Sequence, residues 1–322
     1  MTVAPTSKAK PQPFRIFPVR VRRVHRLSPS FVRITFEGPD LHAMADNGYD
    51  QRVKLILPLA GHGLAPLPRG EDWYAAWRLL PDEQRNPIRT YTVRYVRPDP
   101  CEVDIDMVLH GNVDGLAVGP AAEFALRARP GDEAVLLGPD AAYAGRHGGL
   151  EFRPPSRAAR MLLAADETGV PAVASIVRRL PGQAVGNVLL EVPHPDDRFD
   201  LGAPPGVTVS WAARGGSGHG SNLLRMVRTA DLPRPAGRVA AAQVAASDRR
   251  DAAPDELLWE VPAERADTTD ATGRAGADGL YAWVAGEAST VRAIRRHLVS
   301  ELGHDRRSVA FMGYWRMGRA EC

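Results

Sequence analysis

The spacing of apolar residues changes once along this chain of 322 residues, close to residue 160. From about residue 17 to residue 139, short extended runs such as VRVRRV and FVRITFEG are separated by turn residues, a pattern typical of antiparallel strands. Further runs of this kind cover residues 54–57, 90–95 and 103–109. Closing such strands into a small barrel removes their unpaired edges, so we expect a β-barrel in this half.

After residue 160 the pattern becomes strand, loop and helix. The apolar run MLLAA suits a buried parallel strand, and it is followed by apolar residues at helical spacing, with Gly182 to end the helix. Further strands are predicted in NVLLEV, VTVSW, YAWVAG and SVAFMG. This alternation predicts a doubly wound parallel sheet, which binds ligands at the carboxyl ends of its strands.

The chain is long enough for two domains, each with its own core. We predict an antiparallel β-barrel domain over residues 14–150 and a nucleotide-binding α/β domain over residues 157–322. Residues 230–279 are rich in Ala, Asp, Arg, Pro and Thr, which indicates a flexible insertion with the segment DELLWEVP as an ordered island.

Composition excludes several classes of protein. The formal net charge is only +3 and the arginines are spread along the chain, so nucleic acid is not an expected partner. The two cysteines, Cys101 and Cys322, are too few for a disulfide framework or an iron–sulfur cluster. No segment approaches the roughly 20 apolar residues that span a bilayer. We therefore expect a cytoplasmic protein that does not insert into a membrane.

The stretch NPIRTYTVR holds an informative strand. Because side chains alternate along a strand, Arg89, Tyr91 and Val93 share one face, and Thr92 lies on the other. Arginine and tyrosine also cover ordinary barrel surfaces, so the strand alone leaves two interpretations open.

The two-domain order favours one of them. A β-barrel followed by a nucleotide-binding domain is the layout of flavin reductases that accept hydride from a nicotinamide. In that layout the guanidinium of Arg89 pairs with pyrophosphate, the ring of Tyr91 lies against the isoalloxazine, and the hydroxyl of Thr92 bonds near N5. We assign Val93 to the same FAD site.

Several segments together resemble the siderophore-interacting proteins, which are FAD-dependent ferric-siderophore reductases. The resemblance spans nearly the whole chain and implies a ferredoxin-reductase-like architecture. It also implies a cytoplasmic enzyme that passes electrons from NADPH or NADH through FAD to Fe(III) held by a siderophore. The segments that carry it, in chain order, are RVKLILP, IRTYTVR, DMVLHG, VGPAAEFALRARPGDEAVLLGP, AADETGVPA, YAWVAGEASTVRAIRRHL and GYWRMG.

The residues around Gly119 are small enough to bring backbone N–H groups close to an anion, although a turn that requires glycine is the alternative. The resemblance implies that His110, Gly111, Gly119, Ala121 and Ala122 contact FAD. Other members often carry a hydroxyl residue in this loop, so a side-chain bond to phosphate is in doubt here. The resemblance also places Trp315 near the flavin, where the residue alone would be taken for a core anchor.

Asp166, Glu167 and Thr168 follow the buried strand MLLAA and precede a helix. Two adjacent carboxylates rarely converge on one bond, so we do not expect a glycosidase pair. At a helix N-terminus Thr168 and the loop amides are placed for flavin or nicotinamide, and we assign Asp166 and Glu167 to the nicotinamide site.

A second strand-to-helix loop supplies Gly286, Glu287 and Ser289, whose amides are placed for a dinucleotide. Helix capping explains Ser289 equally well. Arg214 lies beyond the strand VTVSW, where a guanidinium reaches a 2′-phosphate in such folds, although it is equally explained as a solvated arginine. Arg214 together with Arg292 and Arg295 favours NADPH over NADH.

Two other motifs carry no ligand in this interpretation. The loop GGSGHGS lacks the lysine of a phosphate loop and the G-x-G-x-x-G spacing, so we expect a flexible surface loop. His194, Asp196 and Asp197 lie between prolines with no second cluster, which indicates an exposed loop and no metal site. The iron arrives with its chelator, so no resident metal is expected.

The expected substrate is a ferric siderophore, which is commonly anionic. Arg52 and Lys54 lie two apart on one strand face, and a cationic pocket there would attract it. No acid–base side chain is obligatory, so we name no catalytic residue and treat the flavin contacts as positioning groups. Two alternatives stay open: a non-enzymatic siderophore or flavin carrier, and a flavin reductase with another electron acceptor. We expect a monomer.

Overall fold

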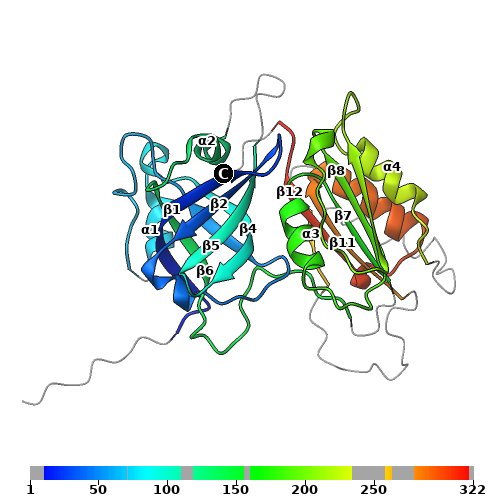
Figure 1. Ribbon diagram of the computed structural model, residues 1–322, viewed down its shortest axis with the longest axis horizontal. Helices are drawn as coiled ribbons and strands as arrows, with labels where there is room; N and C mark the ends of the chain where they lie inside the picture. Colours follow the sequence, from blue (N-terminus) through cyan, green and yellow to red (C-terminus); the bar gives the residue numbers. More distant parts are fainter. Residues whose placement is uncertain are drawn as a thin grey trace, which may run out of the picture.

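The computed structural model describes residues 11–70, 72–109, 119–155, 160–233, 258–262 and 279–318. These residues form a closed barrel and an α/β domain that lie side by side, with helix α3 (Val170–Val177) between them (Figure 1). The expected fold class is confirmed. Within the described segments no helix is long and apolar enough to cross a membrane.

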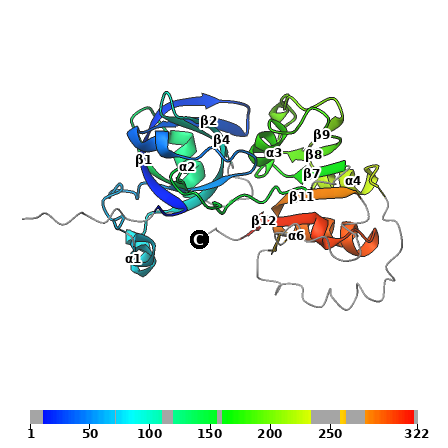
Figure 2. The same ribbon diagram turned by 90° about the horizontal axis from the view of Figure 1, so that it is seen from below.

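The barrel strands follow the order β1-β2-β5-β4-β3-β6, with antiparallel pairing throughout. Helix α1 (Trp73–Leu79) lies on the outside of the barrel, away from the second domain (Figure 2), and α2 (Pro120–Arg127) precedes the last strand. The strands are β1 (Phe14–Arg26), β2 (Phe31–Glu37), β3 (Arg52–Ile56), β4 (Ile88–Arg97), β5 (Glu102–Val108) and β6 (Glu133–Pro139).

Strand β5 is buried on both faces. One face places Val103, Ile105 and Met107 in the barrel core. The opposite face carries three acidic residues that are also buried, because arginines of neighbouring strands cover and pair with them. The pairs are Arg23 with Glu102, Arg97 with Glu102 and Asp104, and Arg33 with Asp106.

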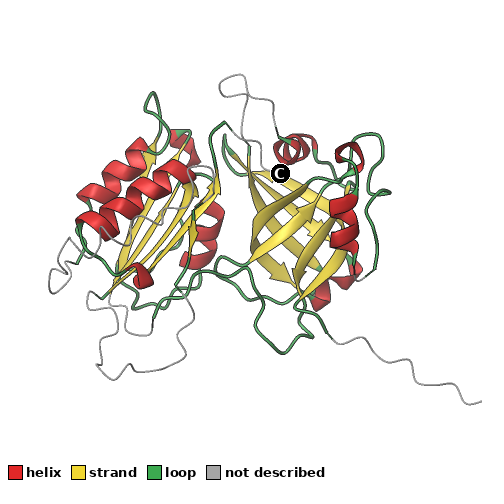
Figure 3. Cartoon of the chain, turned by 180° about the vertical axis from the view of Figure 1, so that it is seen from behind, coloured by secondary structure: helices red, strands yellow, loops and turns green. Residues whose placement is uncertain are grey.

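The second sheet follows the order β10-β12-β11-β7-β8-β9. All of its strands are parallel except β10, which pairs antiparallel with β12 at one edge. Helices α4 (Ser221–Thr229) and α6 (Ala288–Arg295) cover the face away from the barrel, and α3 covers the other (Figure 3). The strands are β7 (Arg160–Ala165), β8 (Gly186–Val192), β9 (Val207–Ala213), β10 (Trp259–Glu260), β11 (Leu280–Glu287) and β12 (Val309–Trp315).

The order in which the strands are added to the sheet reverses between β7 and β11, since β8 and β9 follow β7 on one side and β12 follows β11 on the other. In such sheets ligands bind beyond the carboxyl ends of the two strands at this reversal. We call the side of the sheet where the parallel strands end, with β7 and β11 at its middle, the carboxyl edge. The ordered island expected in the insertion is present as β10; residues 234–257 and 263–278 lie outside the described residues.

The junction between the domains depends on Asp50, a fully buried carboxylate that precedes β3. Its oxygens accept hydrogen bonds from the backbone N–H groups of Glu151 and Phe152, in the segment between the domains. They also accept a bond of 3.0 Å from the indole Nε1 of Trp283 in β11. Burial raises the pKa of Asp50 despite these bonds. One carboxylate therefore joins the barrel, the connecting segment and the second sheet.

A second junction contact corrects the interpretation of PHPDD as an exposed loop. Asp197 is fully buried and accepts hydrogen bonds from the hydroxyl of Ser28 at 2.6 Å and the backbone N–H of Ser30 at 2.8 Å. His194 and Asp196 remain at the surface. The turn between β1 and β2 thus docks on the α/β domain, a long-range contact that the local sequence pattern did not reveal.

Replacing Asp50 by alanine tests the junction. The change leaves the indole of Trp283 and two backbone amides buried without their acceptor, so the free energy of unfolding should fall by about 2 to 5 kcal/mol. Urea unfolding followed by tryptophan fluorescence measures it. Asp40→Ala, at a partly exposed barrel aspartate, is the control and should change stability by less than about 0.5 kcal/mol. Equal stability of both variants would contradict the role of Asp50.

Candidate functional site

Strand β4 carries the predicted flavin residues and faces the second domain. Arg89 is half-buried and donates from Nη1 to the carbonyl of Ile88 at 2.9 Å. Tyr91 packs partly on the barrel core, while Thr92 and Val93 are buried. Their role in binding flavin stays a prediction.

Helix α3, which follows the strand end of β7, packs against this strand. The hydroxyl of Ser175 donates to the carbonyl of Val93 at 3.2 Å, and Nη2 of Arg178 donates to the carbonyl of Arg94 at 3.3 Å. The helix therefore runs in the same direction as β4, and its N-terminal end, which follows Thr168, lies toward the start of that strand. The predicted flavin strand therefore packs against the helix that follows the predicted nicotinamide loop.

The loop that enters α2 supplies the next predicted flavin residues. A Cβ atom at Gly119 would meet no atom of the described residues within 4 Å, so the backbone there is open to an approaching group. Ala121 and Ala122 are buried, and Ala121 packs in the barrel core. His110 and Gly111 lie outside the described residues, and their assignment stays a prediction.

Arg94 was not singled out from the sequence. It is only 8 % exposed, and its Nε and Nη1 atoms have no hydrogen-bond acceptor among the described residues. Burial lowers the pKa of this guanidinium, which nevertheless stays charged at neutral pH. This buried guanidinium lies two residues from Thr92 and shares Asp106 with Arg33. Together with Arg89, it fits an anionic cofactor such as FAD.

At the carboxyl edge the buried carboxylate of Asp166 joins three strand ends. Oδ1 accepts hydrogen bonds from the amide and hydroxyl of Thr168, at 2.9 and 2.5 Å. Oδ2 accepts from the amide of Glu287 at 2.7 Å and from the indole of Trp315 at 3.0 Å. A Cβ atom at Gly286, where φ is +145°, would lie 2.6 Å from the Cγ of Asp166, so this approach requires glycine. Trp315 is thus anchored beside the predicted nicotinamide loop.

Glu167, next in the chain, belongs to an ion-pair network. It pairs with Nη2 of Arg214 at 2.5 Å and with Nε2 of His219 at 3.4 Å. Arg214 also donates from Nε to the fully buried Glu191 at 3.0 Å. The ring of His219 contacts Trp315 edge-on, with centroids 4.8 Å apart. Arg214 is therefore held between two carboxylates.

The network sets opposite pKa shifts on neighbouring carboxyl groups. Burial, reinforced by the charge of Glu167, raises the pKa of Asp166 to about 6. Burial alone would also raise the pKa of Glu167, but the hydrogen bond from His219 and the charge of Arg214 outweigh it and lower that pKa to about 2. The same contacts with Glu167 raise the pKa of His219 against the effect of its burial.

Asp166, Glu167 and His219 place possible metal-ligand atoms within 4.8 Å of one another. However, each oxygen of Asp166 already accepts two hydrogen bonds, and Glu167 pairs with the permanent cation of Arg214. An added metal ion would have to displace these donors and would meet a guanidinium at close range. We therefore interpret the cluster as an ion-pair network.

Protein carboxylates also occupy the helix N-termini of this edge. Glu287 caps α6 by accepting hydrogen bonds from the amides of Ser289 and Thr290, at 2.7 and 3.0 Å, and from the Ser289 hydroxyl. Glu191 accepts bonds from the amides of Gly220 and Leu223, at 2.8 and 2.9 Å, at the start of α4. The hydroxyl of Ser289 is thus turned to Glu287, and Glu287 caps the helix in its place.

A pocket of about 200 Å³ lies between these two helix starts. A Cβ atom at Gly220, where φ is +76°, would collide with the hydroxyl of Thr290, so glycine lets the two helices approach. The loop expected to be a flexible surface loop is exposed at residues 215–218 and at Ser221, whereas the side chain of His219 is turned inward. The lining residues are His219, Gly220, Ser221, Leu224, Ser289, Thr290 and Ala293.

The two predicted substrate residues have different surroundings. Lys54 is exposed and donates from Nζ to the hydroxyl of Thr90 at 2.7 Å. Arg52 pairs with Glu151 at 2.5 Å and lies over the ring of Trp259, 4.5 Å from its centroid. Arg52 therefore contacts the connecting segment and β10, whereas Lys54 remains on the open face. Their role in substrate binding stays a prediction.

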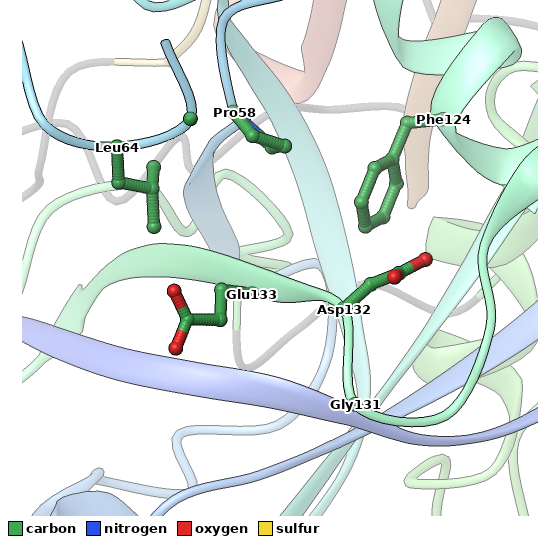
Figure 4. A pocket seen from close by; sticks show the side chains of 7 residues that line it. Pro58, Leu64, Phe124, Gly131, Asp132 and Glu133 are labelled. Atoms are coloured by element: carbon green, nitrogen blue, oxygen red, sulfur yellow. The ribbon is translucent and has the colours of Figure 1, made fainter. Parts of the chain in front are cut away.

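A hollow of about 410 Å³ lies elsewhere on the barrel, between the loop after β3, helix α2 and the start of β6. Figure 4 shows Leu64, Pro58 and Phe124 around it, with Asp132 and Glu133 at its floor. Its lining includes two carboxylates and no cation, and none of the predicted site residues. It is therefore a poor site for an anionic ligand.

Both domains match models of known protein families. The model of the siderophore-interacting FAD-binding domain matches residues 20–143, and that of the siderophore-interacting protein matches residues 158–318. An uncharacterized protein of Mycobacterium tuberculosis is 31% identical over 96% of this chain and 93% of its own length. The ferric vibriobactin reductase of Vibrio cholerae is 28% identical over 95% and 92%. The structure of a siderophore utilization protein from T. fusca is 28% identical, covers 96% of this chain and 95% of its own, and has a TM-score of 0.68.

The pKa of Asp166 gives a pH-dependent prediction. Because the folded-state pKa of about 6 exceeds the ordinary 3.8, the folded protein holds this proton more tightly than the unfolded chain. Its contribution to stability is full below the ordinary pKa and is lost as pH rises through the folded one. The stability of the wild type relative to Asp166→Asn should therefore fall by about 2 to 3 kcal/mol between pH 4 and pH 7. Urea unfolding across this pH range measures it, and a constant difference would contradict the shift.

Proposed function

The chain belongs to the siderophore-interacting protein family, and from this membership we propose that it is an FAD-containing, NAD(P)H-dependent reductase of ferric siderophores. The observation that carries the proposal is the junction of β4 with α3. There the predicted flavin strand packs against the helix that follows the predicted nicotinamide loop, which supports an arrangement that brings two bound rings together for hydride transfer. The relative from Vibrio cholerae, named a ferric vibriobactin reductase, supports the same reaction class.

When bound, FAD takes a hydride and delivers its electrons singly, which matches a two-electron donor to the one-electron acceptor Fe(III). Fe(III) is a hard cation that oxygen ligands bind tightly, and Fe(II) is held less strongly, so reduction releases the metal from its chelator. In this proposal Arg89 pairs with the pyrophosphate, and Tyr91 and Thr92 position the ring. The protein supplies position and charge and needs no acid–base group.

The donor contacts proposed at the carboxyl edge are Asp166, Glu167, Arg214, Gly286, Glu287 and Ser289. Arg214 donates to Glu167 and Glu191, so a 2′-phosphate would have to share this guanidinium with two carboxylates. Arg295 donates to Glu260 at 2.8 Å. The preference for NADPH over NADH thus stays a prediction, and both dinucleotides are proposed donors.

The proposed substrate is an anionic ferric siderophore that approaches the exposed face of Lys54. Arg52 contributes positive charge nearby, although its pairing with Glu151 reduces its effect at a distance. We also propose that the protein is a monomer and acts in the cytoplasm.

The visible spectrum of the purified protein tests the reaction class. A bound flavin should bleach on anaerobic addition of NADPH or NADH and recover its colour when a ferric siderophore is then added, with Fe(II) trapped by a coloured chelator. A flavin that bleaches but is not reoxidised by the chelate indicates a reductase with another acceptor. A flavin that neither donor bleaches would favour a carrier and overturn the proposal.

The Arg89→Ala variant should lose flavin first. Removing a charge-assisted bond to pyrophosphate costs about 1.5 to 3 kcal/mol of binding free energy, which raises the dissociation constant for FAD about 10- to 150-fold. Fluorescence titration of the apoprotein with FAD measures it. Arg22→Ala, at a mostly exposed arginine of β1, is the matched control and should leave the constant unchanged. Unchanged affinity in Arg89→Ala would show that another group holds the pyrophosphate.

The Lys54→Glu variant separates a siderophore reductase from a general flavin reductase. It should raise KM for an anionic ferric siderophore, most strongly at low salt where the inverted charge is least screened, and leave flavin reduction by the nicotinamide intact. The control Thr90→Val removes the hydrogen-bond partner of Lys54 without changing the charge. An unchanged KM for Lys54→Glu across a salt series, or an equal effect in Thr90→Val, would reject the cationic pocket.

A further inference from the structure

Among the residues that the structure describes, Arg94 shares its counter-charge with a second arginine. The nearest carboxylate is Asp106, with Oδ2 3.7 Å from Nε of Arg94, beyond hydrogen-bonding distance. Asp106 is already bound by Arg33 through two bonds, of 2.6 and 2.9 Å. One carboxylate therefore serves two guanidinium groups, and one net positive charge remains among the three. Buried charges are ordinarily paired, so this one requires an explanation.

The other neighbours add positive charge. The guanidinium carbons of Arg33, Arg94 and Arg178 lie 5.2, 4.9 and 4.8 Å from the ring centroid of Tyr95. The ring face attracts each cation weakly and holds the group together, but it carries no net charge. The cluster thus has a surplus of positive charge at the junction between β4 and α3.

This surplus lies next to the proposed flavin ring. Arg94 is two residues beyond Thr92 on β4, roughly 7 Å along the strand, at the irregularity in pairing between Val93 and Tyr95. Over such a distance in a buried site a charge acts much more strongly than it would in water. It needs no contact with the ring, which agrees with the enclosure of its Nε and Nη1 atoms.

We propose that Arg94, through its charge, binds the reduced form of the flavin more tightly than the oxidised form and so raises the reduction potential of the bound cofactor. The inference rests on the proposed function. The reduced ring carries more negative charge than the oxidised ring, and charge near the ring is one way in which a protein tunes a flavin. Arg94 is a tuning residue and not a catalytic one. A higher potential favours the transfer of electrons from the nicotinamide donor to the flavin.

The experiment is a potentiometric titration of the purified flavoprotein against a reference dye. Arg94→Met keeps much of the side-chain length and removes the charge, so the midpoint potential should fall. A tenfold loss in the preference for reduced over oxidised flavin corresponds to about 30 mV for a two-electron couple, and we expect at least this change. Arg94→Lys keeps the charge and should retain most of the wild-type potential. Arg22→Met is the surface control.

A second variant, in which the potential is expected to change in the opposite direction, distinguishes an electrostatic effect from damage to the fold. Asp106→Asn removes the counter-charge of Arg33 and increases the positive surplus, so the potential should rise. Each variant is checked for flavin content and for its thermal unfolding midpoint. If Arg94→Met does not fold, Asp106→Asn and Arg94→Lys decide the question.

Three results would overturn the inference. The first is a midpoint potential of Arg94→Met equal to that of the wild type, and the second is a potential of Asp106→Asn that does not rise. The third is an equal fall in Arg94→Met and Arg94→Lys, which would indicate that packing on Tyr95, and not charge, sets the potential. A wild-type protein that reduces the ferric chelate while the variant potentials stay unchanged would reject this inference alone. A wild-type protein without flavin, or with a flavin that neither donor reduces, would reject the proposed function itself.

Discussion

The buried carboxylate of Asp50 is the contact on which the geometry of this protein depends. It binds the connecting segment through the amides of Glu151 and Phe152 and binds the second sheet through the indole of Trp283. The proposed hydride transfer needs residues from both domains, because the flavin strand belongs to the barrel and the carboxyl edge to the sheet. A small rotation between the domains would separate them. Asp197 provides a second anchor at the turn between β1 and β2, so the orientation is held at more than one place.

Electrostatics at the carboxyl edge differs from what a dinucleotide-binding fold first suggests. Helix N-termini ordinarily attract phosphate through free amides and the helix dipole. Here Glu287, Glu191 and Asp166 accept hydrogen bonds from amides of the two helix starts and of the loop before α3. A dinucleotide must therefore bind against negative charge or through side chains. The barrel side of the junction has the opposite sign, since Arg94 retains its charge. The junction thus separates a negative sheet edge from a positive flavin strand.

Much of the fold was predictable because it follows from local patterns. The short extended runs between residues 17 and 139 predicted the barrel strands, and the strand-to-helix alternation after residue 160 predicted the second sheet. The segment DELLWEVP was correctly expected to contain an ordered element, although its pairing with β12 was not foreseen. In contrast, the interpretation of Asp197 as exposed was wrong, because its partners lie more than 160 residues away in the sequence. The burial of His219 inside a glycine-rich loop had no local signal either.

The sequence by itself determined the class of each domain, their order, and which strand and loops carry chemically useful side chains, because periodicity and turn residues act over a few neighbours. Only the tertiary structure decided how those side chains are used. Arg214, alone in the sequence, proved to be held by Glu167 and Glu191, and Arg94, inconspicuous in its motif, proved to be a buried cation without a full counter-charge. The reason is physical: charge pairing and burial depend on distances between segments far apart in the chain, which no local pattern encodes.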